Sequence, residues 1–134
     1  MAPVAVAIAL IEGDGRWLVQ QRPAGRHLAG TWEFPGGKIA PGETAREAVV
    51  REVQEELGLQ VAIDAALGTV RHAYAERQVV LHPFICHVID GTPAAVEGQA
   101  LRWVTAEALM SLPIPAANRG LVEALQGSGP RGTP

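Results

Sequence analysis

Apolar residues occur along the chain in short runs separated by turn signals, a pattern that predicts β-strands. Residues 4–11 (VAVAIALI) are apolar without interruption, which indicates a central strand buried on both faces. Pro83 interrupts the longest run, residues 78–89, and predicts an edge or a bulge there. The other predicted strands or extended segments are 17–21, 32–34, 61–63, 67–74 and 100–104.

Residues 45–57 have instead the 3.6-residue period of an amphipathic helix. Thr44 and Glu47 form a capping-box pair at its start, and Gly58 suits the left-handed residue that ends a helix. The helix face toward the sheet is predicted to consist of Val49, Val50, Val53 and Leu57. This helix is the best defined element that the sequence predicts.

Two shorter helices are predicted in the last third of the chain. One begins near Thr105, and the other runs from Asn118, as its N-cap, to about Leu125. Earlier in the chain, Gly36 and Gly37 follow Pro35, so the backbone can turn tightly there and approach a ligand. Strands flanked by helices predict an α/β protein, an α/β/α sandwich with a mixed sheet.

The chain has 134 residues, which suits a single domain over residues 1–126, followed by a Gly- and Pro-rich tail, 127–134, that is expected to be disordered. Aromatic residues make up only 4% of the chain, so aliphatic side chains must fill the core. A net charge of −3 argues against direct binding of duplex nucleic acid, although not against a single nucleotide held by a metal.

Cys86 is the only cysteine, so no intrachain disulfide can form, and its strand context predicts a buried thiol rather than a nucleophile. The first residues lack the pattern of a signal peptide, and no apolar stretch approaches the length of a membrane span. We therefore expect a cytoplasmic protein without membrane contact.

Three acids crowd the C-terminal half of the predicted helix, since Glu52 precedes Glu55 and Glu56 by three and four residues. Like charges at this spacing destabilise a helix by about 0.2–0.5 kcal/mol per pair. The helix dipole also disfavours acids near a C-terminus. A solvated acidic face is the ordinary explanation, but a divalent cation bound by the carboxylates accounts for the crowding better.

The segment from Gly37 to Leu59 resembles the Nudix box, G-x5-E-x7-R-E-U-x-E-E-x-G-U with U apolar, which is the signature of a hydrolase family. Every specified position is matched, by Gly37, Glu43, Arg51, Glu52, Val53, Glu55, Glu56, Gly58 and Leu59. The resemblance implies a Nudix-like fold and hydrolysis of a nucleoside diphosphate linked to another group. It also implies Mg²⁺, with Mn²⁺ as an alternative, held by Glu52, Glu55 and Glu56.

In the same family, the residue at Arg51 orients the glutamates, and Glu43 braces the loop or reaches the metal shell. The resemblance further implies that the Gly36 carbonyl and Glu97 join the metal site. Glu52 or Glu97 would then be the catalytic base. Taken alone, Glu97 is an isolated acid before a strand, for which surface charge is the ordinary explanation.

Residues 22–38 and 113–125 resemble the matching segments of MutT-type 8-oxo-dGTP diphosphatases within this family. The candidate substrate-binding residues are Arg22, His27, Phe34, Lys38, Leu81 and Asn118, and the resemblance makes Asn118 the base-recognition residue. Cationic side chains would contact the phosphates, Phe34 and Leu81 would form the walls of a base slot, and Asn118 would recognise the base edge. A solvated loop charge for Arg22, ordinary core for Leu81 and a helix cap for Asn118 remain open.

Together these resemblances imply a magnesium-dependent nucleoside triphosphate pyrophosphohydrolase that releases the monophosphate and pyrophosphate, with 8-oxo-dGTP as the leading substrate. A pyrophosphatase for CTP or another pyrimidine triphosphate is the nearest alternative. A non-catalytic Nudix-fold module that binds a nucleotide or a protein is the third, but such modules usually lose box acids, and this chain keeps them all. A monomer or a weak dimer is expected.

Overall fold

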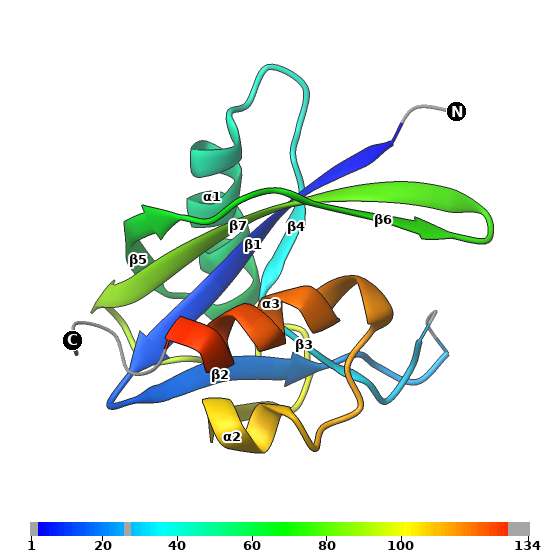
Figure 1. Ribbon diagram of the computed structural model, residues 1–134. Coiled ribbons are helices and arrows are strands. Elements are labelled where there is room, and N and C mark those ends of the chain that lie inside the picture. The colour runs from blue at the N-terminus through cyan, green and yellow to red at the C-terminus, as the bar shows by residue number, and fades with distance from the viewer. Residues whose placement is uncertain (1–2, 26–27, 129–134) are drawn as a thin grey trace.

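The computed structural model of the protein describes residues 3–25 and 28–128 (Figure 1). Strands and helices follow one another along the described chain in this order: β1 (Val4–Gly13), β2 (Arg16–Gln21), β3 (Trp32–Glu33), β4 (Gly36–Lys38), α1 (Ala45–Leu57), β5 (Gln60–Ala66), β6 (Val70–Tyr74), β7 (Arg77–Asp90), β8 (Leu101–Thr105), α2 (Ala106–Leu109) and α3 (Ala116–Ser128). No helix in the described ranges is both long enough and apolar enough to cross a membrane.

Strand β1 lies at the centre of a mixed sheet. It pairs in parallel with β7, from Val4 opposite Val79 to Ile11 opposite Cys86. It also pairs antiparallel with β2 and β4, and β7 continues the sheet to β5 and β6. The uninterrupted apolar run of β1 therefore reflects neighbours on both sides and burial on both faces, as its sequence predicts.

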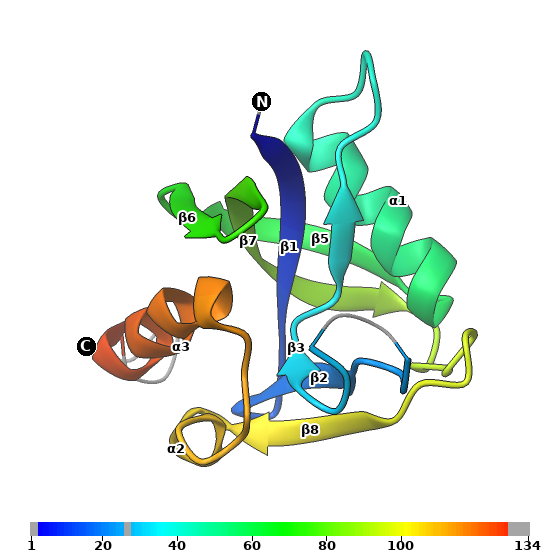
Figure 2. The ribbon, with the colours of Figure 1, turned by 90° about the vertical axis from the view of Figure 1, so that its right-hand side faces the viewer.

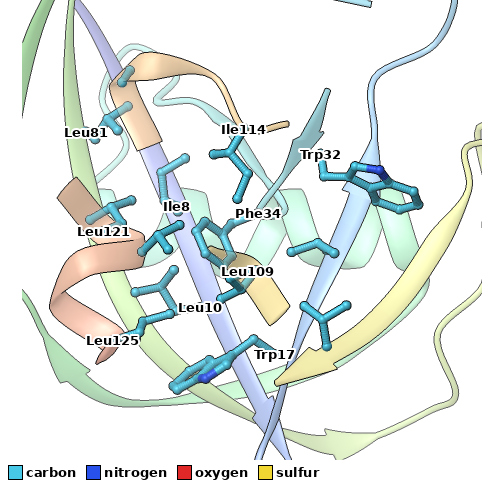
Figure 3. Packing of buried hydrophobic residues seen from close by; sticks show 14 of the residues in the cluster. Ile8, Leu10, Trp17, Trp32, Phe34, Leu81, Leu109, Ile114, Leu121 and Leu125 are labelled. Carbon is cyan, nitrogen blue, oxygen red and sulfur yellow. The ribbon is translucent and has the colours of Figure 1, made fainter. Parts of the chain in front are cut away.

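Successive side chains of β1 enter two separate cores, because side chains alternate between the faces of a strand. Ala7, Ala9 and Ile11 pack in one core with buried residues of α1. Ile8 and Leu10 pack in the other with residues of α2 and α3 (Figure 3). Figure 2 shows α1 on one side of the sheet and the other two helices on the opposite side. This layering confirms the predicted α/β/α sandwich.

The ends of helix α1 are as its sequence predicts. Thr44 and Glu47 form a complete capping box, and Gly58 ends the helix in the left-handed conformation with φ of 66°. The predicted packing face is partly wrong, because Val50 is 37% exposed whereas Ala48 is fully buried. At about 100° per residue, Glu52 and Glu56 lie between Ala48 and Val49 on the helix circumference. The rotation that buries Ala48 therefore turns these two acids inward.

Two predictions near prolines are wrong. Asn118 is not an N-cap, because α3 already begins at Ala116, directly after Pro115, and extends to Ser128. Pro83 lies in the central strand β7, at neither an edge nor a bulge. The part of β7 before it pairs with β6, and the part after it pairs with β5. The Pro83 carbonyl accepts a hydrogen bond from the Leu67 N–H, in the connection between β5 and β6. The proline nitrogen points to the same side, where no strand needs a hydrogen bond from it.

The predicted glycine turn at Gly36 and Gly37 is in fact strand β4, which pairs with β1. Strand propensity disfavours glycine, so this element gives no sequence signal. The predicted tail begins inside α3, and residues 129–134 lie outside the described part of the chain.

Cys86 is buried, as predicted, and its Sγ lies 3.6 Å from the Phe84 carbonyl oxygen. Burial, together with the negative charge of Asp64, raises the pKa of the thiol to about 12. Since only the thiolate attacks disulfide reagents, we expect no reaction of the folded protein with a chromogenic disulfide at pH 8. Complete reaction is expected in denaturant. Rapid labelling under native conditions would contradict the burial of this thiol.

Candidate functional site

A cavity of about 800 Å³ opens beside the inward-turned acids of α1. Its lining comes from β1, β4, the hairpin between β6 and β7, and the start of α3. Both Glu56 and Asn118 contribute to this lining. A volume of this size is within the usual range for small-molecule sites, roughly 300–1,000 Å³. The cavity therefore connects the candidate metal helix with the candidate base-recognition residue.

The two glycines of β4 allow the backbone to fit tightly between β1 and α1. A Cβ atom on Gly36 would lie 2.1 Å from the Ala7 carbonyl oxygen, and the φ of Gly36 is 154°. A Cβ atom on Gly37 would lie 2.4 Å from the carboxyl carbon of Glu52. The Gly36 N–H donates to Glu56 Oε1 at 3.1 Å. The missing side chain of Gly36 thus makes room for the β1 backbone, and that of Gly37 makes room for the carboxyl group of Glu52.

Arg51 connects three acids and a backbone carbonyl. Its guanidinium donates to both carboxylate oxygens of Glu43, at 2.7 and 2.9 Å. It also donates to Glu52 at 3.1 Å, to Glu55 at 3.0 Å and to the Lys38 carbonyl. Hydrogen bonding to Glu43 is the main cause that raises the pKa of Arg51 above its ordinary range. This geometry gives Arg51 the orienting position that the sequence resemblance implies.

Glu56 is the acid in the most unusual surroundings. Burial raises the pKa of this carboxyl group to about 8, and the charge of Glu52 acts in the same direction, while the Gly36 N–H opposes both. A carboxyl group in this position is costly to ionise without a compensating positive charge. A divalent cation would supply that charge.

The oxygen donors present here fit a hard cation such as Mg²⁺. Within the described ranges, no three acidic, histidine or cysteine side chains gather into a metal-binding group. Glu52 and Glu55 accept hydrogen bonds from Arg51. Glu56 instead accepts them from the Gln20 side chain and the Gly36 N–H. The Glu55 side chain is also 58% exposed. The structure therefore brings Glu52 and Glu56 to one side of β4 and leaves Glu55 at the solvent edge.

The predicted phosphate-contacting residues have different positions. Arg22 lines the cavity and forms a 2.7 Å ion pair with Glu33, a residue that sequence reasoning missed. Lys38 also lines the cavity and is exposed. His27 lies outside the described residues. Arg22 and Lys38 thus line the same cavity as Glu56, and the charge of Arg22 is paired with that of Glu33.

The residues predicted to form the base slot all line the cavity. Phe34 and Leu81 are buried, and both line the cavity (Figure 3). Asn118 is only 8% exposed, and among the described residues its Oδ1 atom has no hydrogen-bond partner. An unpaired buried acceptor costs about 1–3 kcal/mol. A ligand that donates a hydrogen bond here would remove this cost.

Tyr74 is a second residue that sequence reasoning gave no role in the site. Its side chain lines the cavity, and its hydroxyl accepts from the Ala117 N–H at 3.2 Å. Ala117 directly precedes Asn118 at the start of α3. Pro115 offers no side-chain cap to this helix, so Tyr74 satisfies one of the free N–H groups of the first turn.

Glu97 does not line the cavity, and its side chain is exposed. It lies in the connection between β7 and β8, which contacts α1 through the Ala94 N–H and the Leu57 carbonyl. The Glu97 N–H donates to the side chain of Gln99, which in turn donates to the Glu56 carbonyl. Its backbone is thus attached to the helix that carries the acids.

Comparisons with known proteins identify the family of this chain. The model of the NUDIX domain matches residues 6–124. The chain is 39% identical to the CTP pyrophosphohydrolase of Escherichia coli, over 92% of each chain. It is 43% identical to the putative 8-oxo-dGTP diphosphatase 2 of Mycobacterium tuberculosis, over 93% of this chain and 92% of that one.

Its fold is similar to the crystal structure of a MutT protein from Methanosarcina mazei, with a TM-score of 0.81 and 30% identity. This similarity covers 94% of this chain and 95% of that one. Sequence and fold comparisons therefore lead to the same group of proteins.

The ion pair between Glu43 and Arg51 makes the stability of the protein depend on pH. Hydrogen bonding from Arg51 lowers the pKa of Glu43 from 4.5 to about 2. A lowered folded-state pKa stabilises the protein above the unfolded value, and this contribution is lost as the pH falls toward the folded value. Wild type should therefore be more stable than Glu43→Gln at pH 7, and the difference in Tm should shrink from about pH 4.5 to pH 2. A difference that is constant over this range would contradict the interpretation.

Proposed function

Because this chain belongs to the Nudix family and is a nucleotide diphosphatase, we propose that it hydrolyses 8-oxo-dGTP to 8-oxo-dGMP and pyrophosphate. In this way it removes an oxidised nucleotide from the cytoplasmic pool before a polymerase can use it. The observation that carries the proposal is the unpaired Oδ1 of Asn118 in the cavity that also contains Glu56. The similarity to the putative 8-oxo-dGTP diphosphatase of Mycobacterium tuberculosis supports it.

The chemistry of Asn118 favours an oxidised over an ordinary guanine. Its side chain offers one acceptor and one amide donor group. On 8-oxoguanine, N7 carries a hydrogen and O6 accepts, so this edge can pair with both groups. On guanine, N7 is an acceptor. The Oδ1 atom would then face another acceptor and stay unpaired, which is the kind of mismatch that gives strong discrimination.

CTP is the second candidate substrate. The exocyclic amine of cytosine is a donor beside the N3 acceptor, so Asn118 can pair with this edge as well. The similarity to the CTP pyrophosphohydrolase of Escherichia coli favours this candidate. Asn118 can therefore pair with either candidate and does not separate them from one another.

Charge compensation and positioning account for the reaction at this site. A divalent cation, when bound, supplies charge neutralisation on the phosphates and activation of water. Glu52 and Glu56 would hold it, with Glu55 at the solvent edge and the Gly36 carbonyl as a further ligand. Glu97, whose backbone is connected to Glu56 through Gln99, would join from its loop. Arg51 donates hydrogen bonds to Glu52 and Glu55 and so orients both carboxylates. Arg22 and Lys38 contact the phosphate chain, and Phe34 and Leu81 exclude water from the base.

Replacement of Glu52 tests the assignment of the carboxylates. Glu52→Gln keeps the shape of the side chain and its contact with Gly37 but removes the negative charge. We expect the rate of pyrophosphate release with Mg²⁺ to fall by at least ~10², the size of effect seen when a general base or essential ligand is lost. Glu47→Gln on the same helix is the control. Full activity in Glu52→Gln would overturn this assignment.

A substrate panel tests the base specificity. Pyrophosphate release is measured with 8-oxo-dGTP, dGTP, CTP and dCTP, for wild type, Asn118→Ala and the control Glu123→Ala, an exposed position of the same helix. We expect kcat/KM to be highest for 8-oxo-dGTP, and the preference over dGTP to be lost in Asn118→Ala alone. A preference for CTP that Asn118→Ala abolishes would select the second candidate. Flat kinetics that are unaffected by Asn118→Ala would exclude Asn118 as the base-recognition residue.

A further inference from the structure

Two buried glutamines lie directly behind the acids of α1. Gln20 in β2 is 4% exposed, and Gln99, just before β8, is 8% exposed. They are joined side chain to side chain, although they are far apart in the sequence. We propose that they form an amide relay that positions the Glu56 carboxyl group and the loop carrying Glu97. This inference rests on the proposed function, because it concerns residues assigned there to the metal site.

The direction of the relay is fixed by backbone groups. The Glu97 N–H can only donate, and it lies 2.9 Å from Gln99 Oε1. The Glu56 carbonyl can only accept, and it lies 3.2 Å from Gln99 Nε2. These two contacts determine which side of the Gln99 amide is oxygen and which is nitrogen.

The orientation of Gln99 then determines that of Gln20. Gln99 Nε2 also donates to Gln20 Oε1 at 3.1 Å, so Gln20 must direct its own nitrogen away from Gln99. That nitrogen donates to Glu56 Oε1 at 3.3 Å. Gln20 can therefore only donate to the carboxyl group, and this contact holds Oε1 of Glu56 in one place.

The relay also selects one oxygen of Glu56. Oε1 accepts from both Gln20 and the Gly36 N–H. Oε2 receives no hydrogen bond from the residues that the structure describes. The geometry therefore leaves Oε2 as the oxygen available to a cation or to a proton.

The same two side chains connect Glu56 with the loop that carries Glu97. The Gln99 side chain hydrogen-bonds to the backbone of both acids: it accepts from the Glu97 N–H and donates to the Glu56 carbonyl. Loss of Gln99 would release the loop and the relay together, whereas loss of Gln20 would release only the carboxyl group. Both are positioning residues, since neither lines the cavity.

The test measures Mn²⁺ binding to nucleotide-free protein by electron paramagnetic resonance, together with kcat and KM for 8-oxo-dGTP and CTP. The variants are Gln20→Met, Gln99→Met and the double variant, with Gln60→Met, an exposed glutamine, as control. Methionine keeps the length of the side chain and removes the amide. We expect Mn²⁺ affinity to weaken roughly 10–100-fold in each single variant, as for other groups that orient metal ligands. kcat should fall while KM changes little.

Coupling between the two residues distinguishes a relay from two separate packing effects. In a relay, the double variant loses little more Mn²⁺ affinity than Gln99→Met alone. If the two losses multiply, or if both single variants bind Mn²⁺ like wild type, the inference is overturned. Should a methionine variant fail to fold, Gln20→Asn replaces it, because the amide is then one methylene short of Glu56 and the same loss is expected.

Wild-type behaviour separates this inference from the proposed function. If wild type neither binds Mn²⁺ nor releases pyrophosphate, the proposed function is wrong and the inference falls with it. If wild type does both and the glutamine variants are unchanged, only the relay is overturned.

Discussion

The close contact of the β4 backbone with β1 on one side and with α1 on the other is the constraint on which the site depends. Gly36 touches the Ala7 carbonyl so closely that no side chain fits, and Gly37 leaves space only for the carboxyl group of Glu52. Helix α1 must be rotated so that Glu52 and Glu56 face the β4 backbone, and this rotation buries Ala48 and exposes Val50. Backbone packing thus decides which acids of the helix face inward.

Charged and polar groups are arranged around the β4 backbone in two layers. Arg51 forms the outer layer, where it holds Glu43, Glu52 and Glu55 together in reach of solvent. The inner layer is uncharged apart from Glu56 and consists of amide and backbone donors. Electrostatic interactions are weakly screened by solvent inside a protein. A cation bound between the layers would therefore interact most strongly with Glu56, the acid with the least competing positive charge.

Elements whose structure depends on neighbouring residues could be predicted from the sequence. The caps of α1 and the two-sided burial of β1 follow from adjacent residues, and both are confirmed. The match to the Nudix box supplied the expected fold. β4 was missed because two glycines carry no strand preference, and Asn118 was misplaced because Pro115 starts the helix earlier. Gln20 and Gln99 could not be foreseen as partners, because only the pairing of β2 with β8 brings them together. The roles assigned to the site residues remain predictions.

The parallel pairing of β1 with β7 has a consequence for how the protein is made. The first strand cannot complete its ladder until the chain has been synthesised as far as Cys86. Helix α1 precedes that point in the chain, and β5 and β7, which pack against it, follow it. Contacts between distant segments form late because closing a long loop costs entropy. A nascent helix α1 would therefore expose its apolar face until β7 has been made, and charged side chains beside that face would favour its solubility.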